Sequence, residues 1–400
     1  MAAVSHAVLP LMTARRPVTA WIVDDTGFPK KGRHSVGVAR QYCGQLGKQD
    51  NCQVAASLSV ATAEASLPIA WRLYLPQDWA ADAARRAEAK VPKTVTFQSK
   101  GEIALEQISQ ALSAEVPAGT VLADAGYGNS SAFRDGLTAL GLEYSVGVLG
   151  TTVVWPPGLT PRVPARRAGG RGQHPKRLRQ GGDNAAVVQV RALAADLPPE
   201  AWRTVSWRSG VAEMLSSRFA ALRVRPAHGD HRRSEPRPEL WLLVEWPKDE
   251  NAPSKFWLST LPEDMALETL VERTMQRWRI ERDYLELKQE LGLGHYEGRG
   301  WRGFHHHGAL CIAAYGFLVA ERAAIPPSAT GHARLVQAPA LPDGHRPRGA
   351  PDTYRTPRAA LDRDTQTPDH PRLGQKATTM PMLQPAESKS QNRSTRVMTQ

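Results

Sequence analysis

Acidic residues at three widely separated places in the chain have the side chains that bind divalent cations. The pair Asp24-Asp25 and the single Asp124 each follow a short apolar run, and Glu281 lies in a stretch of good helix formers. Hard cations such as Mg²⁺ prefer carboxylate oxygens as ligands. Two such ions, held about 3.5–4 Å apart, activate an attacking oxygen and stabilise a leaving one. Acids that converge from two strand ends and one helix face are therefore suited to the cleavage of phosphodiester bonds.

The stretch around Glu281 is predicted to form one uninterrupted helix, because residues 265–291 contain neither Gly nor Pro. At about 100° per residue, Arg277, Glu281 and Lys288 fall on one face, so that one carboxylate lies between two cations. Trp278, Leu285 and nearby leucines would then take the buried side. The simpler interpretation is a surface helix with an Arg277–Glu281 ion pair, worth only a few tenths of a kcal/mol.

The elements that must position these acids follow the order of a mixed α/β sheet. Apolar runs predict strands over residues 19–23, 53–61, 68–75, 120–123 and 144–149, with the acids at the ends of the first and fourth. Apolar spacing predicts helices over residues 101–112 and 130–140, the second capped by Asn129, and residues 28–48 read as a Gly- and Lys-rich loop. This order predicts a ribonuclease H-like α/β fold, a mixed five-stranded sheet flanked by helices.

Composition divides the chain into further parts. Residues 1–17 are expected to be a short leader, and residues 18–150 the first part of the catalytic domain. Residues 151–253 are rich in Arg, Gly, Pro and Trp and predict a basic, β-rich insertion, with strands over residues 186–193, 203–208, 218–225 and 240–246. Residues 254–325 complete the catalytic domain, ending in a helix from Trp301 to Ala324, and residues 326–400 are expected to be a disordered tail.

Charge and cysteine content restrict the class of protein. The formal net charge of +12 favours a polyanionic partner. The three cysteines show no CxxC spacing, which argues against a disulfide framework or a zinc ribbon. The run His305-His306-His307 is expected on a helix face rather than at a metal, because adjacent helical side chains point about 100° apart. No apolar run approaches the length of a membrane helix, so a cytoplasmic, nucleoid-associated protein is expected.

Longer segments carry a resemblance to a known family. The segment RWRIE, followed by Lys288, resembles the third catalytic segment of bacterial insertion-sequence transposases of the DDE superfamily, in the group with a Tyr-Arg-Glu-Lys signature. Thr274 stands where that signature has Tyr. The segments IVDDTGFPKKGRHSVGVARQYCGQLGK and VLADAGYGNSSAFRDGL resemble the same family, in the family's order. The resemblance covers roughly residues 18–325.

The resemblance implies a metal site and its ligands. Asp25, Asp124 and Glu281 would be the catalytic residues and would bind two Mg²⁺ (or Mn²⁺) ions. Asp24 competes with Asp25, and only one of them can face the ions because neighbouring side chains on a strand point to opposite faces. Asp25, which directly precedes Thr26, is the preferred ligand.

The resemblance also suggests residues that contact DNA. Arg277 and Lys288 would bind phosphates beside the metals. Further candidates for the DNA backbone are Lys30, Lys31, Arg33 and Arg40, although each is equally well explained as a solvated charge. Trp155 or Trp207 of the insertion could stack on a flipped base, with packing as the alternative for each.

The function implied is that of a DNA transposase. It would cleave at the ends of an insertion sequence and transfer the freed 3′-hydroxyl into target DNA. The partners would be double-stranded DNA, as terminal inverted repeats and as target, and a second copy of the chain in a dimer on DNA. A truncated, non-catalytic DNA-binding remnant is one alternative, because relatives usually carry a helical end-binding region before the first acid. A stand-alone ribonuclease H-like nuclease is another.

Overall fold

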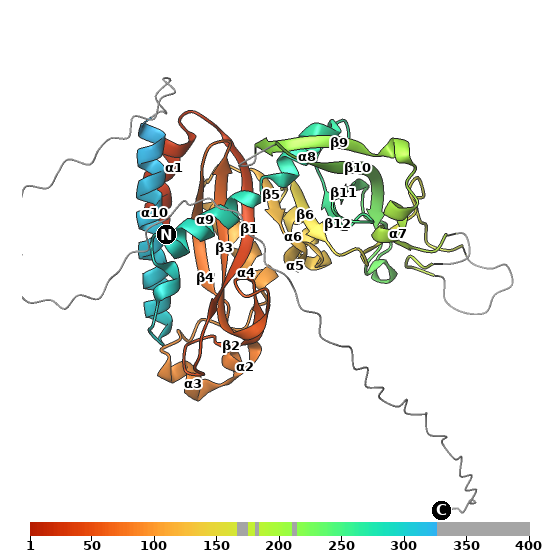
Figure 1. The fold of residues 1–400 in the computed structure, drawn as a ribbon. Helices are drawn as coiled ribbons and strands as arrows, with labels where there is room; N and C mark the ends of the chain where they lie inside the picture. The colour runs from red at the N-terminus through yellow and green to blue at the C-terminus, as the bar shows by residue number, and fades with distance from the viewer. Residues whose placement is uncertain (166–174, 181–183, 210–213, 326–400) are drawn as a thin grey trace, which may run out of the picture. The chain divides into compact units, whose positions relative to one another are not determined.

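The structure is a computed structural model that describes residues 1–165, 175–180, 184–209 and 214–325 (Figure 1). The predicted tail and residues 166–174, 181–183 and 210–213 of the predicted insertion lie outside these residues. The first half of the chain supplies the strands β1 (Val18–Pro29), β2 (Ala39–Cys43), β3 (Lys48–Thr62), β4 (Ser66–Leu73), β5 (Thr120–Ala123) and β6 (Tyr144–Val148). The second half supplies β7 (Val153–Trp155), β8 (Val188–Gln189), β9 (Arg203–Ser209), β10 (Met214–Pro226), β11 (Leu240–Trp246) and β12 (Lys255–Ser259). The protein is therefore a mixed α/β structure.

The first-half strands form one side of a sheet in the order β4-β3-β1-β5-β6. β1 pairs antiparallel with β3 and parallel with β5, and β5 pairs parallel with β6. The strands at the centre are apolar and fully buried, as Trp21, Ile22 and Leu122 illustrate. A strand with both faces covered needs such a continuous apolar run, which is why the short runs in the sequence located β1 and β5.

The sheet does not end at β6, contrary to the expected five strands. β12 pairs antiparallel with β6, with Phe256 opposite Val148, and β11, β10, β7 and β8 follow. In the described residues the result is one sheet of twelve strands. An open edge at β6 would leave a row of unpaired backbone donors and acceptors, and the strands of the insertion satisfy them. The insertion is thus an extension of the sheet.

The helices are α1 (Ala2–Thr13), α2 (Gln77–Ala81), α3 (Ala83–Glu88), α4 (Lys100–Ser113), α5 (Ala125–Gly128), α6 (Ser131–Ala139), α7 (Val190–Ala195), α8 (Leu267–Met275), α9 (Trp278–Gln289) and α10 (Trp301–Ala324). In Figure 1, α10 lies beside α1, and α9 crosses the sheet near β1. Residues 1–17, expected to be a leader, therefore include a helix that packs through Val8, Leu9 and Met12.

Several local predictions are wrong for identifiable reasons. The predicted loop 28–48 contains β2, which pairs with residues 48–52 of β3. The second half of the strand predicted over residues 186–193 lies in helix α7, whose Ala-rich sequence favours a helix. Ser130, not Asn129, caps α6, because its Oγ accepts from Phe133 N at 3.3 Å. Asn129 instead accepts from Thr152 Oγ1.

The helix predicted over residues 265–291 is broken at Gln276 and Arg277. Gln276 Oε1 accepts from Thr19 Oγ1 at 2.7 Å, and Arg277 contacts Asp24 on the same strand. Bonds to β1 at two consecutive residues outweigh the local helix propensity, which is a weak effect by comparison. The break separates α8 from α9 and sets the direction of α9.

The buried face of α9 is also different from the expected one. Leu285 is 53% exposed, whereas Ile280, Asp283, Tyr284 and Leu287 are buried. The side chains at positions 277, 281, 284 and 288 share a face by helical spacing, and Tyr284 on that face is buried against the sheet. The signature residues therefore belong to the side of α9 that faces β1.

The three consecutive histidines lie on α10, as expected. His305 joins α10 to the edge strand β4, since its Nε2 accepts from Leu73 N at 3.2 Å while Nδ1 bonds Trp301 O at 2.9 Å. Burial lowers the pKa of His305 below its usual value of 6.5. This neutral ring satisfies one backbone donor of an edge strand.

This burial predicts a pH dependence of stability. Below pH 6.5 the unfolded chain binds a proton at His305 that the folded chain does not, so the free energy of unfolding should fall as pH drops below 6.5. Urea titrations between pH 5 and pH 8 would measure this. In His305→Gln that part of the pH dependence should be absent, and an unchanged slope in this variant would assign the effect to another group.

In the described residues, no helix combines the length and apolar character that crossing a membrane requires.

Candidate active site

Two strand registers bring the first acids together. Residues 20–23 of β1 pair in parallel with residues 120–123 of β5, so Asp24 and Asp124 each follow the last paired residue. The acids were expected at the end of the first strand. β1 instead continues beyond them to Pro29, paired with β3 alone. Side chains at paired positions of neighbouring strands point to the same face. Asp24 and Asp124 are therefore neighbours at one edge of the parallel strands.

Asp24 is a buried carboxyl with two other carboxylates nearby. Its side chain is only 14% exposed, and Arg277 Nη1 donates to its Oδ2 at 2.9 Å. Burial raises the pKa of Asp24 to about 7; Arg277 opposes this shift, and the charges of Asp124 and Asp25 add to it. The acid is thus held where a single cation does not fully compensate its charge.

Glu281 lies on the other side of the same guanidinium. Arg277 Nη2 donates to Glu281 Oε1 at 3.2 Å while Nη1 contacts Asp24, so Arg277 bridges the two acids. The side chain of Glu281 is 66% exposed. The Arg277–Glu281 pair expected from the sequence is present, and its guanidinium also brings Glu281 beside β1.

Lys288 has a different setting from the one expected for a phosphate-binding residue. Its Nζ donates to Gly27 O at 2.9 Å and to Gln45 Oε1 at 3.3 Å, and it lies 5.0 Å from the centre of the Phe28 ring. Burial lowers the pKa of Lys288. As placed, Lys288 holds α9 against β1 just beyond the acids.

Two further polar residues, Tyr284 and Asp283, fix α9 through hydrogen bonds that the sequence did not predict. Tyr284 Oη shares a hydrogen bond of 2.7 Å with Ser57 Oγ, and Ser57 is the cross-strand partner of Asp24. Asp283 accepts from Ser66 Oγ at 2.6 Å and from Tyr315 Oη at 2.8 Å. These bonds connect α9 to β3, β4 and α10, and so hold Glu281 at a set position relative to Asp24.

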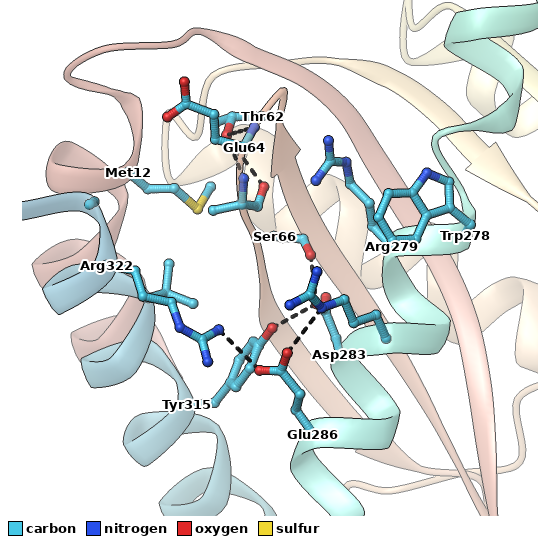
Figure 2. Close-up of a pocket in the computed structure, with 14 residues that line it drawn as sticks. Met12, Thr62, Glu64, Ser66, Trp278, Arg279, Asp283, Glu286, Tyr315 and Arg322 are labelled. Atoms are coloured by element: carbon cyan, nitrogen blue, oxygen red, sulfur yellow. Dashed lines mark hydrogen bonds and ion pairs between the residues drawn. The ribbon is translucent and has the colours of Figure 1, made fainter. Parts of the chain in front are cut away.

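Figure 2 shows the contacts of Asp283 at a pocket of about 190 Å³ between α9, α10 and the β3–β4 turn. Asp283 is 2% exposed, and burial raises its pKa to about 6. Arg282 and Arg322 both contact Glu286 at the rim, at 3.0 and 3.1 Å. Cationic and acidic side chains alternate around this pocket, and their contacts join α9 to α10.

Asp25, the preferred ligand in the sequence, points away from Glu281. Lys100 Nζ donates to Asp25 Oδ2 at 2.6 Å, and Tyr127 Oη donates to the same oxygen at 3.4 Å. Lys100 and Tyr127 belong to α4 and α5, whereas Asp24 contacts Arg277 at the start of α9. The contacts thus do not support the preference for Asp25, and the ligand set Asp25, Asp124 and Glu281 stays a prediction.

Asp124 has a structural bond of its own. Its Oδ1 accepts from Gly126 N at 2.9 Å and from Tyr127 N at 3.4 Å, which caps the short helix α5. α5 packs closely on β6, since a Cβ on Gly128 would lie 2.2 Å from Gly147 O. Gly128 is therefore explained by packing, and the close contact of α5 with β6 places the capped acid at the edge of the sheet.

The donor set suits a hard divalent cation. Asp24, Asp124 and Glu281 offer only carboxylate oxygens, which Mg²⁺ and Mn²⁺ prefer. Burial raises the pKa of Asp24, and the charges of Asp124 and Asp25 add to this shift, so a bound cation would favour the ionised carboxylate. In the described part of the chain, no three Asp, Glu, His or Cys side chains stand close enough to hold one metal ion as placed. The guanidinium of Arg277 occupies the position between Asp24 and Glu281.

The other predicted DNA contacts differ in their settings. Lys30 donates from Nζ to Tyr296 O and lies 6.0 Å from the centre of the Tyr296 ring. Lys31, Arg33 and Arg40 are exposed. Exposed cations on the segment after β1 remain candidates for backbone contacts, whereas Lys30 already has a structural partner.

The setting of Trp155 favours packing, the alternative to the base-stacking role suggested for it. Its side chain is 1% exposed, and Nε1 donates to buried Asp230 Oδ2 at 2.7 Å. Trp207 is partly buried and packs edge-to-face on Phe219, with ring centres 5.3 Å apart. Trp155 is therefore a buried residue of β7, the strand that pairs with β10.

Truncation of Trp155 should therefore unfold the insertion rather than alter DNA recognition. Trp155→Ala is expected to lower the free energy of unfolding by about 3–5 kcal/mol, through the cavity and the orphaned Asp230. Trp155→Phe should lose less, because it keeps most of the volume. Urea unfolding followed by circular dichroism would measure both, and an unchanged midpoint for Trp155→Ala would contradict the burial.

The chain was compared with solved structures and with known sequences. Among solved structures, the NurA nuclease from Sulfolobus solfataricus aligns over 80% of this chain and 94% of its own, at 8% identity and a TM-score of 0.24. That score is too low to support a conclusion. A probable transposase for insertion sequence element IS701, from Microchaete diplosiphon, is 32% identical over 134 residues. The match spans 33% of this chain and 32% of the relative, so the chain covers about a third of that relative's length.

The family profile covers more of the chain. Residues 1–214 match the DDE superfamily endonucleases, which is more than half of the 400 residues. The matched region includes Asp24, Asp25 and Asp124 together with α4. The resemblance seen in the sequence is thereby confirmed. The chain belongs to the DDE superfamily of endonucleases, with an insertion-sequence transposase among its relatives.

Proposed function

We propose that this protein is a DNA transposase that cleaves DNA at the ends of an insertion sequence and joins the freed 3′-hydroxyl to target DNA. The observation that carries the proposal is that Asp24 and Asp124 are adjacent in register and that Arg277 bridges Asp24 to Glu281, so one guanidinium links acids from separate elements. Membership of the DDE superfamily and the name of the IS701 relative support it. The strand order β4-β3-β1-β5-β6 also supports a ribonuclease H-like core, because it places Asp24 and Asp124 in adjacent register.

The ligands of the proposed metal centre are Asp24, Asp124 and Glu281, with Asp25 as the alternative to Asp24. The contacts favour Asp24, since it shares Arg277 with Glu281 whereas Asp25 pairs with Lys100. Two divalent cations, Mg²⁺ or Mn²⁺, would supply activation of the attacking oxygen and charge stabilisation of the leaving one.

The protein's own groups then have separate tasks. Arg277 would exchange its carboxylate partners for a phosphate of the DNA, because a guanidinium can donate two N–H groups to phosphate oxygens as it does to carboxylate oxygens. Tyr284, Asp283 and Lys288 would keep α9 fixed on the sheet, so that Glu281 does not move during the reaction. A rigidly held acid contributes more to the reaction rate than a mobile one, because small displacements of a catalytic group slow the reaction strongly.

The proposed partners follow from charge and from the reaction. The net charge of +12 favours double-stranded DNA, both as the terminal inverted repeats and as the target. Pairing of two ends requires two active sites, and we propose a dimer on DNA. A protein with these partners would work at the nucleoid in the cytoplasm.

Incubation of the purified protein with supercoiled plasmid in Mg²⁺ or Mn²⁺ tests the proposal. Nicking that disappears with EDTA, together with joining of a pre-cut end to the plasmid, is the expected result. Nicking without joining would reduce the function to that of a nuclease. Binding without nicking in either metal would favour a non-catalytic DNA-binding remnant.

A further inference from the structure

A cation that the sequence did not single out contacts the acid pair from the side opposite to α9. Lys100 is the first residue of α4, and its Nζ donates to Asp25 Oδ2 at 2.6 Å. Asp24 and Asp25 are adjacent on β1, so their side chains point to opposite faces. Arg277 therefore approaches the pair from one face and Lys100 from the other.

Helix stability does not explain a lysine at this position. The N-terminal end of a helix carries partial positive charge, where acids are favourable and lysines are not. The helix end is satisfied without Lys100, because Ser99 and Glu102 form a reciprocal capping box. A cation in an unfavourable place, with a satisfied helix end beside it, indicates a role outside the helix.

The attachment of α4 to the sheet does not depend on Lys100 either. Ile103 and Ile108 are buried beneath α4, and Gln107 Nε2 donates to Ala56 O at 3.2 Å. Ala56 lies on β3 as the cross-strand partner of Asp25, so this bond already fixes the position of α4 on β3 beside Asp25. The side chains of Lys100 and Asp25 are 39% and 22% exposed, and ion pairs this accessible to water contribute little to stability.

The ammonium group of Lys100 has capacity to bind a second anion. It carries three N–H donors, and Asp25 Oδ2 accepts from one of them. Tyr127 Oη donates to the same carboxylate oxygen at 3.4 Å, so Asp25 keeps a hydrogen-bond donor when the lysine leaves. Asp25 can therefore release Lys100 to another anion without losing every partner.

We propose that Lys100 is a DNA-binding residue whose ammonium leaves Asp25 for a phosphate of the DNA backbone beside the acids. The inference rests on the proposed function, because it requires DNA at this edge of the sheet. Arg277 from α9 and Lys100 from α4 would then hold the backbone from two sides. Asp25 keeps Lys100 extended toward the acids in the absence of DNA.

Metal-free DNA binding tests this without any cleavage. The dissociation constant of the full-length protein for a labelled duplex of about 30 base pairs is measured in EDTA over a series of salt concentrations. Each phosphate contact changes the slope of log affinity against log salt by about 0.9. Lys100→Met should weaken binding several-fold and reduce the slope by about that amount, and Lys100→Arg should restore it. Lys93→Met, which removes an equal charge from an exposed site in the preceding loop, should leave the slope unchanged.

The variant Asp25→Asn distinguishes a DNA contact made by Lys100 from a purely structural ion pair between Lys100 and Asp25. It releases the ammonium, so its DNA binding should equal or exceed that of the wild type in EDTA. Equal weakening by Asp25→Asn and Lys100→Met, or a wild-type salt slope for Lys100→Met, would overturn the inference and leave the proposed function standing. No DNA binding by the wild type would overturn both. If Lys100→Met fails to fold by circular dichroism, Lys100→Gln gives the same comparison with a polar side chain.

Discussion

Plasmid nicking should be lost in Glu281→Gln, by about a thousandfold or more, while DNA binding in EDTA remains. The substitution keeps the size and the hydrogen bond of the side chain but removes the negative charge that a divalent cation requires. Loss of about 4 kcal/mol of transition-state stabilisation corresponds to this factor. The side chain is 66% exposed, so the fold should not change.

Glu290→Gln is the matched control. It lies at the end of the same helix, is exposed, and removes an equal charge. Its nicking rate should stay within about twofold of the wild type, because exposed surface substitutions away from a site have small effects. Full activity in Glu281→Gln would remove the third acid from the site and with it the proposed metal centre.

The second large effect should distinguish the two adjacent acids of β1. Asp24→Asn should lower nicking by about a thousandfold, for the same electrostatic reason as at Glu281. Asp25→Asn should keep nicking within about tenfold of the wild type, because its carboxylate faces α4 and α5. Single-turnover rates at saturating protein would compare the chemistry alone. The reverse ranking would return the first ligand to Asp25.

Stability should move in the opposite direction to activity at Asp24. Burial is the largest influence on this carboxyl and raises its pKa from 3.8 to about 7, so the folded state disfavours the charged form. An acid of this kind loses stability as pH rises from the unfolded pKa to the folded one. Asp24→Asn removes that penalty and should raise Tm at pH 8. A lower Tm would mean that the bond to Arg277 outweighs burial.

Much of the site could be predicted from the sequence, because its signals are local. Apolar runs of four or five residues located β5 and the start of β1, and helical spacing located α10 from Trp301 to Ala324. The same spacing placed Arg277, Glu281 and Lys288 on one face. Long segments in family order identified the superfamily, which the match over residues 1–214 confirms. These features depend on neighbours in the chain, so a sequence contains them.

Other features depended on which elements pack together. The alternation of a strand says that Asp24 and Asp25 face opposite ways, but only the positions of α9 and α4 decide which acid faces Glu281. Leu285 and Trp155 were misplaced because exposure is set by the neighbour that covers a face, and hydrophobicity alone does not identify that neighbour.

Lys100 illustrates the limit most clearly. It lies 75 residues from Asp25 in the chain, in a helix whose own pattern gives no reason for a cation, and only packing of α4 on β3 brings the two together. From the sequence alone came the acids, the cations of α9 and the family, because these follow from residue types and local spacing. The tertiary structure alone decided which acid meets Glu281 and which lysine stands opposite, because both depend on contacts between residues far apart in the chain.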